Sequence, residues 1–180
     1  MPFHATGQKF SVPTGTSLPT LDLERVFVLT SSYTCSASES IINGLRGVGI
    51  DVIQIGGNTC GKPYGFYPED NCGTTYFSIQ FRGVNELGFG EYAEGFSATR
   101  TLGDPQANLP GCGASDDLSR ELGDPAEGQL QAALTRLNTG ACPAPPPGGF
   151  LEPHQAELYP DGGALRKPPR LPWKDNRILR

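Results

Sequence analysis

The chain has 180 residues, a formal net charge of −5 and no run of about 18 apolar residues, the length that a membrane-spanning helix needs. Its hydrophobic content is 37%, and its 24 glycines and 17 prolines concentrate toward the two ends, which leaves room for one modest ordered domain in the middle. Residues 1–164 hold 8 basic and 18 acidic side chains, an acidic balance that argues against a nucleic-acid surface.

The first segment, residues 1–24, is rich in Pro, Thr, Ser and Gly and is predicted to be a connector. Met1 is followed by neither a basic start nor an apolar block, so no signal peptide is predicted within it. The apolar, β-branched run RVFVLT at residues 25–30 then predicts a buried strand.

A serine follows this strand at the start of a predicted helix. Residues 38–48 place four apolar side chains on one helical face: Ile41, Ile42, Leu45 and Val48. Ser36 therefore lies at a strand-to-helix corner, where backbone N–H groups and the positive end of the helix dipole point outward. A serine there has an anion-stabilising site beside it, which attack on a carbonyl requires.

The same residues also support a purely structural interpretation. Ser36 and Glu39 have the spacing of a helix capping box, and such boxes far outnumber catalytic serines. The catalytic interpretation depends on the loop after the next strand.

That strand is predicted over residues 51–55 and leads into the sequence GGNTCGK, which ends at Lys62. A lysine held beside a serine in a water-poor site can act as its general base. The two histidines, His4 and His154, lie near opposite ends of the chain, so a Ser-Lys pair is favoured over a Ser-His-Asp arrangement.

The order of strand, TCSASE, apolar helix, strand and G-x-T-x-G-K resembles the catalytic core of the C-terminal processing (tail-specific) serine peptidases, over about residues 25–100. The resemblance implies an α/β fold, part of a Clp-protease/crotonase-like catalytic domain. It makes Ser36 the nucleophile and Lys62 the general base, and it places the backbone N–H of Ala37 in the oxyanion hole. It implies a peptide or protein substrate and no metal or organic cofactor.

Two features depart from the family pattern. Many members have a glutamine four residues after the lysine, where this chain has Phe66. The family's upstream strand and glycine-rich turn, which supply the other half of the oxyanion hole, are not recognisable before Arg25. The resemblance therefore assigns residues 25–140 to the C-terminal part of a catalytic domain, with the N-terminal part as a partner.

Two alternatives of other classes remain. One is a truncated or degenerate peptidase half that binds a peptide or partner without cleaving it. The other is a phosphate-binding loop, since residues 56–62 fit its first seven positions, but Pro63 stands where a Ser or Thr should hold magnesium.

The five cysteines indicate in which cellular compartment the protein is expected. Four of them, Cys60, Cys72, Cys112 and Cys142, lie beside Gly or Pro in turn-like contexts that suit disulfides. The preferred pairing is Cys60–Cys72 and Cys112–Cys142 with Cys35 free, and disulfides imply a periplasmic or otherwise extracytoplasmic protein. Five free thiols in a reducing cytoplasm are the alternative. No C-x-x-C pair occurs, so no zinc site is expected.

Further strand and helix signals lie beyond Lys62. Residues 74–81 predict a strand, and Phe89, Tyr92 and Phe96 predict either core or the apolar wall of a peptide site. The sequence LGDP occurs at residues 102–105 and 122–125.

The second LGDP copy predicts a helix that begins with Asp124 as its cap, Pro125 in its first position and Glu127 reaching back to the cap. Its buried stripe is predicted to consist of Leu130, Ala133, Leu134 and Leu137.

Residues 141–180 are predicted to form a Pro-rich basic tail. Residues 165–180 hold 6 basic and 1 acidic side chains, and Trp173, Ile178 and Leu179 could anchor them on the acidic body. A solvated tail and a polyproline ligand for a partner are the alternatives.

Overall fold

A three-stranded parallel sheet forms the centre of the computed structural model, which describes residues 4–9, 11–99 and 101–144. Its strand order is β1 (Arg25–Thr30), β2 (Asp51–Gly56) and β7 (Gly111–Cys112). β1 and β2 pair from Arg25 opposite Asp51 to Thr30 opposite Gly56. The prediction of both strands is confirmed, with β2 one residue longer than predicted, but β1 is not a buried strand, since Thr30 is the one buried residue among its six.

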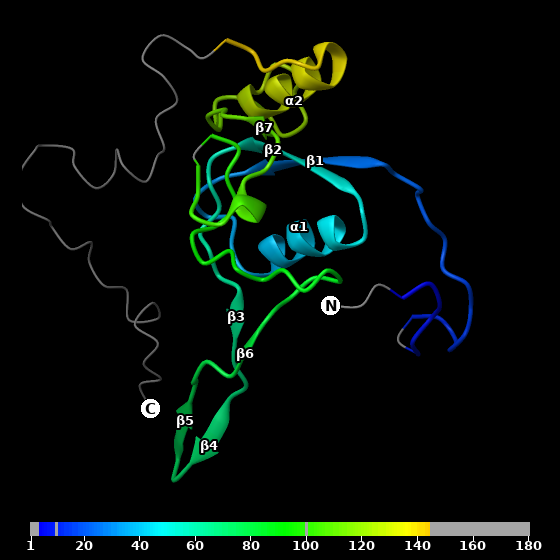
Figure 1. Ribbon diagram of the computed structural model, residues 1–180, viewed down its shortest axis with the longest axis vertical. Helices are drawn as coiled ribbons and strands as arrows, with labels where there is room; N and C mark the ends of the chain where they lie inside the picture. The colour runs from blue at the N-terminus through cyan, green and yellow to red at the C-terminus, as the bar shows by residue number, and fades with distance from the viewer. Residues whose placement is uncertain (1–3, 10, 100, 145–180) are drawn as a thin grey trace, which may run out of the picture.

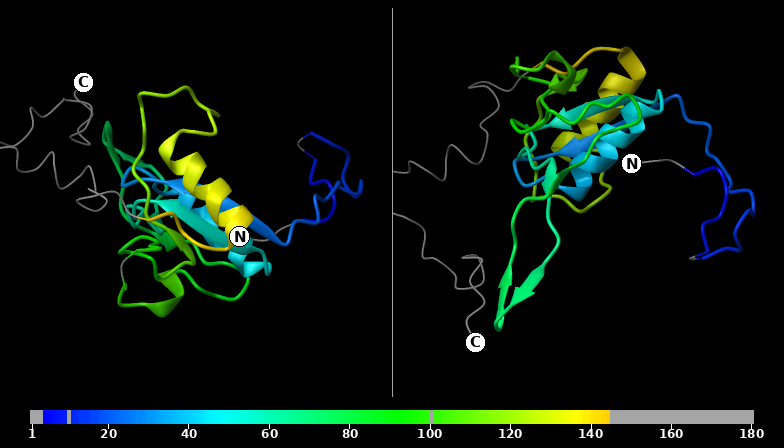
Figure 2. Two further views of the ribbon diagram at one scale, coloured as in Figure 1. Left: turned by 90° about the horizontal axis from the view of Figure 1, so that it is seen from above. Right: turned by 60° about the horizontal axis from the view of Figure 1, so that its bottom comes forward.

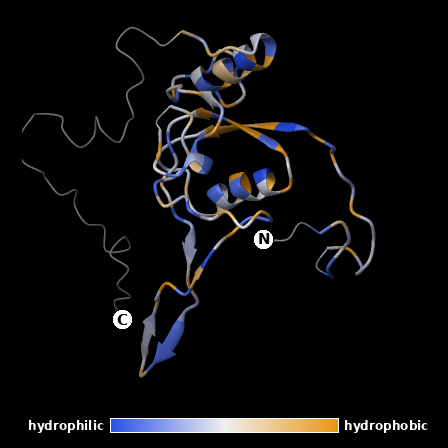
Figure 3. Ribbon diagram, viewed as in Figure 1, coloured by the Kyte–Doolittle hydropathy of each residue, from blue (hydrophilic) through white to orange (hydrophobic). Residues whose placement is uncertain are grey.

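Helices cover both faces of this sheet: α1 (Ala37–Gly47) lies on one face and α2 (Gly128–Thr139) on the other (Figure 1). The left-hand view of Figure 2 shows α2 lying over the strands. Because successive side chains of a strand point to opposite faces, Val52 joins the core under α1 whereas Ile53 and Ile55 pack with α2. Figure 3 shows the apolar colour concentrated on these strands.

The helix predicted at residues 38–48 is confirmed as α1, but its predicted apolar face is only partly right. Ile42 is fully buried and Leu45 packs against the core, whereas Ile41 is 62% and Val48 42% exposed. The buried face also includes polar Asn43, whose Nδ2 donates to the Phe89 carbonyl at 2.8 Å. The buried face of α1 is therefore turned toward Glu39 and Asn43, which leaves Ile41 and Val48 toward solvent.

Between β2 and β7 the chain leaves the sheet and forms a projecting two-stranded arm (Figure 1; Figure 2, right). At its base, β3 (Tyr64–Gly65) pairs antiparallel with β6 (Phe81–Arg82), and at its tip β4 (Glu69–Asn71) pairs with β5 (Thr74–Tyr76). The predicted single strand over residues 74–81 is therefore wrong in extent. Between the two ladders, the Gln80 side chain accepts the Tyr67 N–H at 2.7 Å and interrupts regular pairing.

The aromatic segment after the arm belongs to the core. Phe89, Tyr92 and Phe96 are all buried, and the rings of Tyr92 and Phe96 stack with centroids 4.8 Å apart. The Arg46 guanidinium lies 5.7 Å from the ring centroids of Phe89 and Phe96. Burial lowers the pKa of Arg46, and the nearby charge of Asp104 opposes this shift. The prediction that these three rings belong to the core is confirmed.

The two LGDP copies have different outcomes. In the first, Asp104 caps a 3-10 turn, η1 (Pro105–Ala107), by accepting the Gln106 N–H at 2.8 Å. The second does not start α2 as predicted: Asp124 caps only the preceding turn, and Glu127 caps the helix. The Glu127 carboxylate accepts two backbone N–H groups of the first turn, which Asp124 lies too early to reach.

The buried stripe of α2 agrees with the prediction only at Ala133. It consists of Gln129, Ala132 and Ala133, while Leu137 is 46% exposed. The small alanines let α2 lie close to the sheet, and the side chain of Gln129 donates to the Thr30 carbonyl at 3.0 Å.

All five cysteines lie within the described residues, and four of them form two disulfides, Cys35–Cys60 and Cys112–Cys142. The predicted Cys112–Cys142 pair is confirmed, whereas the predicted Cys60–Cys72 pair and the free Cys35 are wrong. Cys35 and Cys60 follow the adjacent parallel strands β1 and β2, whose carboxyl ends meet at one edge of the sheet. Cys72, in the turn between β4 and β5 at the tip of the arm, is free and exposed.

Among the described residues, none of the helices combines the length and the apolar character needed to cross a bilayer. His154, Trp173, Ile178 and Leu179, and with them the predicted docking of the basic tail, lie outside the described residues.

Candidate active site

Ser36 occupies a strained backbone position between the end of β1 and the start of α1. Its φ is 55° and its ψ is −108°, in the positive-φ region that residues other than glycine rarely adopt. Backbone strain of this kind is concentrated at functional sites, where the surrounding structure maintains it. The next N–H, that of Ala37, is the first of α1, so it has no acceptor within the helix and lies at the positive end of the helix dipole.

Glu39 connects the serine corner to the lysine segment. Its carboxylate is fully buried, and Oε2 accepts the backbone N–H groups of Ser36 at 2.9 Å and of Lys62 at 2.8 Å. Oε1 accepts the Gly61 N–H at 2.7 Å and the Thr59 hydroxyl at 2.6 Å. The predicted capping box is therefore present, but its glutamate also fixes a loop more than twenty residues further along the chain.

Two further links join the same segments. The disulfide connects Cys35, directly before Ser36, to Cys60, two residues before Lys62, with Cα atoms 5.3 Å apart. The Cys60 N–H donates to the Thr34 carbonyl at 3.0 Å. Together with Glu39, these links hold the backbones of the two candidate reacting residues in one place.

The loop that carries Lys62 packs so closely on the following core segment that it requires two glycines. Gly61 has φ 80°, and a Cβ built there would lie 2.1 Å from the Ala93 carbonyl oxygen. Gly95 has φ 84°, and its Cβ would lie 2.1 Å from the Thr59 carbonyl oxygen. Neither position has room for a side chain, so this contact depends on glycine at both.

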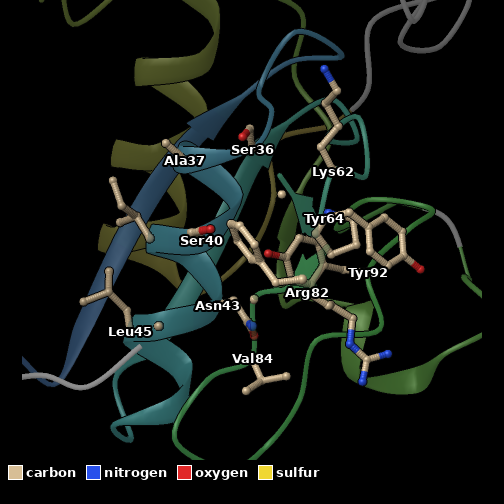
Figure 4. A pocket seen from close by; sticks show the side chains of 16 residues that line it. Ser36, Ala37, Ser40, Asn43, Leu45, Lys62, Tyr64, Arg82, Val84 and Tyr92 are labelled. Atoms are coloured by element: carbon tan, nitrogen blue, oxygen red, sulfur yellow. The ribbon is translucent and has the colours of Figure 1, made fainter. Parts of the chain in front are cut away.

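Ser36 and Lys62 border one cavity of about 780 Å³, which lies between α1 and the base of the arm (Figure 4). Most of its wall is apolar, with Ile41 and Leu45 from α1 facing Tyr64, Phe81 and Val84 from the arm. A cavity of this size can enclose several atoms of a peptide side chain beside the serine.

Figure 4 also shows the Lys62 side chain extending outward from this cavity, away from Tyr64 and Tyr92. In the described part of the chain, no hydrogen bond joins the Lys62 ammonium to the Ser36 hydroxyl. The structure thus brings the two backbones together and both residues to one cavity, and leaves the two reacting groups apart.

Tyr92 lies in the cavity wall opposite the helix and is 1% exposed. Burial raises the pKa of Tyr92, its hydrogen bond with Ser40 lowers it, and the charge of Glu39 raises it, with a net upward shift. Tyr92 therefore remains a neutral hydrogen-bonding group inside the cavity at neutral pH. Arg82, also in the cavity wall, forms an ion pair with Glu91.

The three residues predicted from the sequence, Ser36, Ala37 and Lys62, all line this cavity, and their catalytic roles stay predictions. Sequence reasoning identified Glu39 only as a cap and missed its contacts with Gly61 and Lys62. Phe66, at the position of the family's glutamine, packs edge-on against the ring of Phe77 in the arm and is 50% exposed.

The phosphate-loop alternative is not supported by the geometry. Such a loop leads into a helix whose N-terminus holds the phosphate, whereas residues 56–62 lead through Pro63 into β3. Within the described residues, no group of three or more His, Cys, Asp or Glu side chains could hold a metal ion.

Comparisons of the chain with protein-family models, with curated proteins and with solved structures found no match. The candidate site is therefore defined by its own geometry: a strained serine at a helix N-terminus and a lysine, joined through a buried glutamate and a disulfide at the mouth of one apolar cavity.

Proposed function

We propose that this chain forms the core of a serine-type peptidase in which Ser36 attacks a peptide carbonyl and Lys62 acts as the general base. One observation carries the proposal: Ser36, held at φ 55° on the N-terminus of α1, borders the same cavity as Lys62. The resemblance of the two sequence motifs to the C-terminal processing serine peptidases points the same way.

The chemistry follows from these positions. The Ser36 oxygen forms a bond to the carbonyl carbon while its proton passes to the Lys62 amine, and the Ala37 N–H donates to the resulting oxyanion. The carbon–nitrogen bond then breaks, and Lys62 returns the proton to the leaving amine. Water attacks the acyl group on Ser36, with Lys62 taking its proton and passing it back to the serine.

To perform these steps, Lys62 must turn inward and present its amine without the extra proton, since its side chain extends outward (Figure 4). Its flexible four-carbon stem allows that movement without a change in the backbone, which the hydrogen bond from the Lys62 N–H to Glu39 holds in place.

The setting of this activity is part of the proposal. Two disulfides suit an oxidising environment, so we place the protein in the periplasm or another extracytoplasmic compartment. The family resemblance assigns a second oxyanion donor to an upstream strand, which makes the N-terminal part of a catalytic domain the expected partner. We expect the substrate to be a peptide or protein, since the cavity wall is largely apolar.

A second candidate, a peptide-binding module without hydrolysis, is favoured by one specific feature. The Lys62 ammonium does not contact the Ser36 hydroxyl, while the apolar cavity is fully formed. Such a chain would hold an apolar peptide side chain between α1 and the arm and leave it uncut.

A fluorophosphonate probe with peptide mapping distinguishes the two candidates. Peptidase function requires labelling of Ser36 that is lost in Ser36→Ala and reduced about 100- to 10,000-fold in Lys62→Met, the usual range for a missing general base. Ser38→Ala is the matched control, because Ser38 is exposed on the same turn of α1 but does not line the cavity. Unchanged labelling of Lys62→Met would exclude lysine as the base. Absent labelling together with calorimetric binding of apolar peptides would favour the module.

A further inference from the structure

The Cys35–Cys60 disulfide has a position that the Cys112–Cys142 disulfide does not share. It cross-links the two stretches of chain that carry Ser36 and Lys62, at the sheet edge beside the cavity. The Cys112–Cys142 bond instead ties the end of β7 to the segment after α2. One protein therefore contains a disulfide at the candidate site and a second one away from it.

We propose that the Cys35–Cys60 disulfide is a positioning element of the candidate site, and that acyl transfer on Ser36 depends on its being oxidised. This inference rests on the proposed function. The two cysteines act through their neighbours, because neither lines the cavity.

The Cys35–Cys60 disulfide helps to maintain the strained backbone of Ser36. A positive φ at a residue other than glycine persists only where the surroundings enforce it, and Ser36 directly follows the cross-linked Cys35. The other links between the two segments, the Glu39 carboxylate and the Cys60 N–H donated to Thr34, are hydrogen bonds that open and close without chemistry. The disulfide is a covalent link between the corner and the lysine loop, so it still joins them when those hydrogen bonds open.

The bond is open to reduction, since Cys35 and Cys60 are both partly exposed. A thiolate of a small dithiol attacks one cysteine sulfur, the Cys35–Cys60 bond breaks and a mixed disulfide forms. The second thiol of the reductant then displaces the remaining cysteine. Two electrons and two protons pass from the dithiol to the protein, which leaves two cysteine thiols and an oxidised reductant.

The test compares two double variants in a Cys72→Ser background, which removes the free thiol: Cys35→Ser with Cys60→Ser, and Cys112→Ser with Cys142→Ser as the matched control. The readouts are the maximal rate of Ser36 labelling by a fluorophosphonate and the probe concentration at half-maximal rate. Loss of the site disulfide should lower the maximal rate about 10- to 100-fold, the effect of a displacement of about 1 Å, and leave the half-maximal concentration unchanged. The control should keep the maximal rate.

Chemical reduction provides a second measurement should the site variant fold poorly. The control protein contains only the Cys35–Cys60 bond, so dithiothreitol should lower its labelling rate and reoxidation should restore it, with circular dichroism recording that the fold persists. Equal maximal rates in the two double variants, or in the reduced and reoxidised control protein, would overturn the inference.

Failure of the proposed function gives a different result. If the intact protein does not react with the probe, Ser36 is not an activated nucleophile. Amide hydrogen exchange then tests whether the Cys35–Cys60 disulfide positions the two segments. The backbone N–H groups of Ser36, Gly61 and Lys62 all donate to Glu39. Faster exchange of these three on reduction supports the tether, and unchanged exchange overturns it.

Discussion

The carboxylate of Glu39 accepts the backbone N–H of Lys62 at 2.8 Å, although 23 residues separate the two in the sequence. The same oxygen accepts the N–H of Ser36 at 2.9 Å. A residue that looks like an ordinary helix cap therefore sets the distance between the two candidate reacting residues, and its replacement should affect both stability and reactivity.

We expect Glu39→Gln to lower both stability and Ser36 labelling. A glutamine amide presents one acceptor oxygen and one donor nitrogen, so some of the four groups that donate to Glu39 lose their acceptor, at a cost of about 1–3 kcal/mol for each buried group. Urea unfolding and fluorophosphonate labelling measure the two effects.

Glu127→Gln is the matched control for Glu39→Gln, because Glu127 caps α2 with the same chemistry away from the cavity. It should reduce stability and leave labelling unchanged. Equal labelling by both variants would mean that Glu39 is only a cap.

Replacing Ser36 with glycine should give a more stable protein than replacing it with alanine, by about 1 kcal/mol. Both changes remove the hydroxyl, but only glycine adopts φ 55° without strain. Thermal unfolding of the two variants measures the difference. At Ser38, inside α1, the order should reverse, because glycine destabilises a helix relative to alanine. Equal stability of Ser36→Gly and Ser36→Ala would show that the corner relaxes at no cost.

The buried Tyr92 should make stability fall with rising pH in the alkaline range. Its pKa in the folded protein is raised, chiefly by burial, above the usual value of about 10, so the folded state holds the phenolic proton more tightly than the unfolded state does. The stabilisation is complete below pH 10 and is lost as the pH rises through the folded-state pKa. The comparison uses the Cys72→Ser protein, which lacks the free thiol. Its melting temperature should fall more steeply from pH 8 to 11 than that of the same protein carrying Tyr92→Phe. Parallel curves would contradict this.

Non-reducing peptide mapping should recover Cys35 joined to Cys60 and Cys112 joined to Cys142, with Cys72 alone alkylated in the native protein. Removing the Cys112–Cys142 bond, which closes a loop of about thirty residues, should lower the free energy of unfolding by about 3–4 kcal/mol on the loop-entropy model. Recovery of a Cys60–Cys72 peptide would contradict this pairing and restore the one that turn context suggests.

Local patterns in the sequence predicted two of the three strands of the sheet, β1 and β2, and did not predict β7. The apolar runs identified β1 and β2 almost to the residue, and Ser36 was recognisable as the residue before a helix. These features depend on neighbours in the sequence, which a single chain displays directly.

Features that depend on distant contacts were not predictable in the same way. Cys35 pairs with Cys60 because two parallel strands end side by side, which turn context at each cysteine does not reveal. Asn43 is buried because a loop more than forty residues away accepts its hydrogen bond, which a periodicity of apolar residues cannot show. The position of Glu39 beside Gly61 and Lys62 has the same origin.

The length of the arm and the lining of the cavity depend on different residues of this protein. The cavity is lined by residues at the base of the arm, up to Gly65 and again from Phe81, and by none of residues 66–80. Gly65 lies directly opposite Phe81, and its carbonyl accepts the Gln80 N–H at 3.0 Å, so a short turn could join the two strands at that point. Insertions or deletions among residues 66–80 would therefore alter how far the arm reaches without removing any residue that lines the cavity.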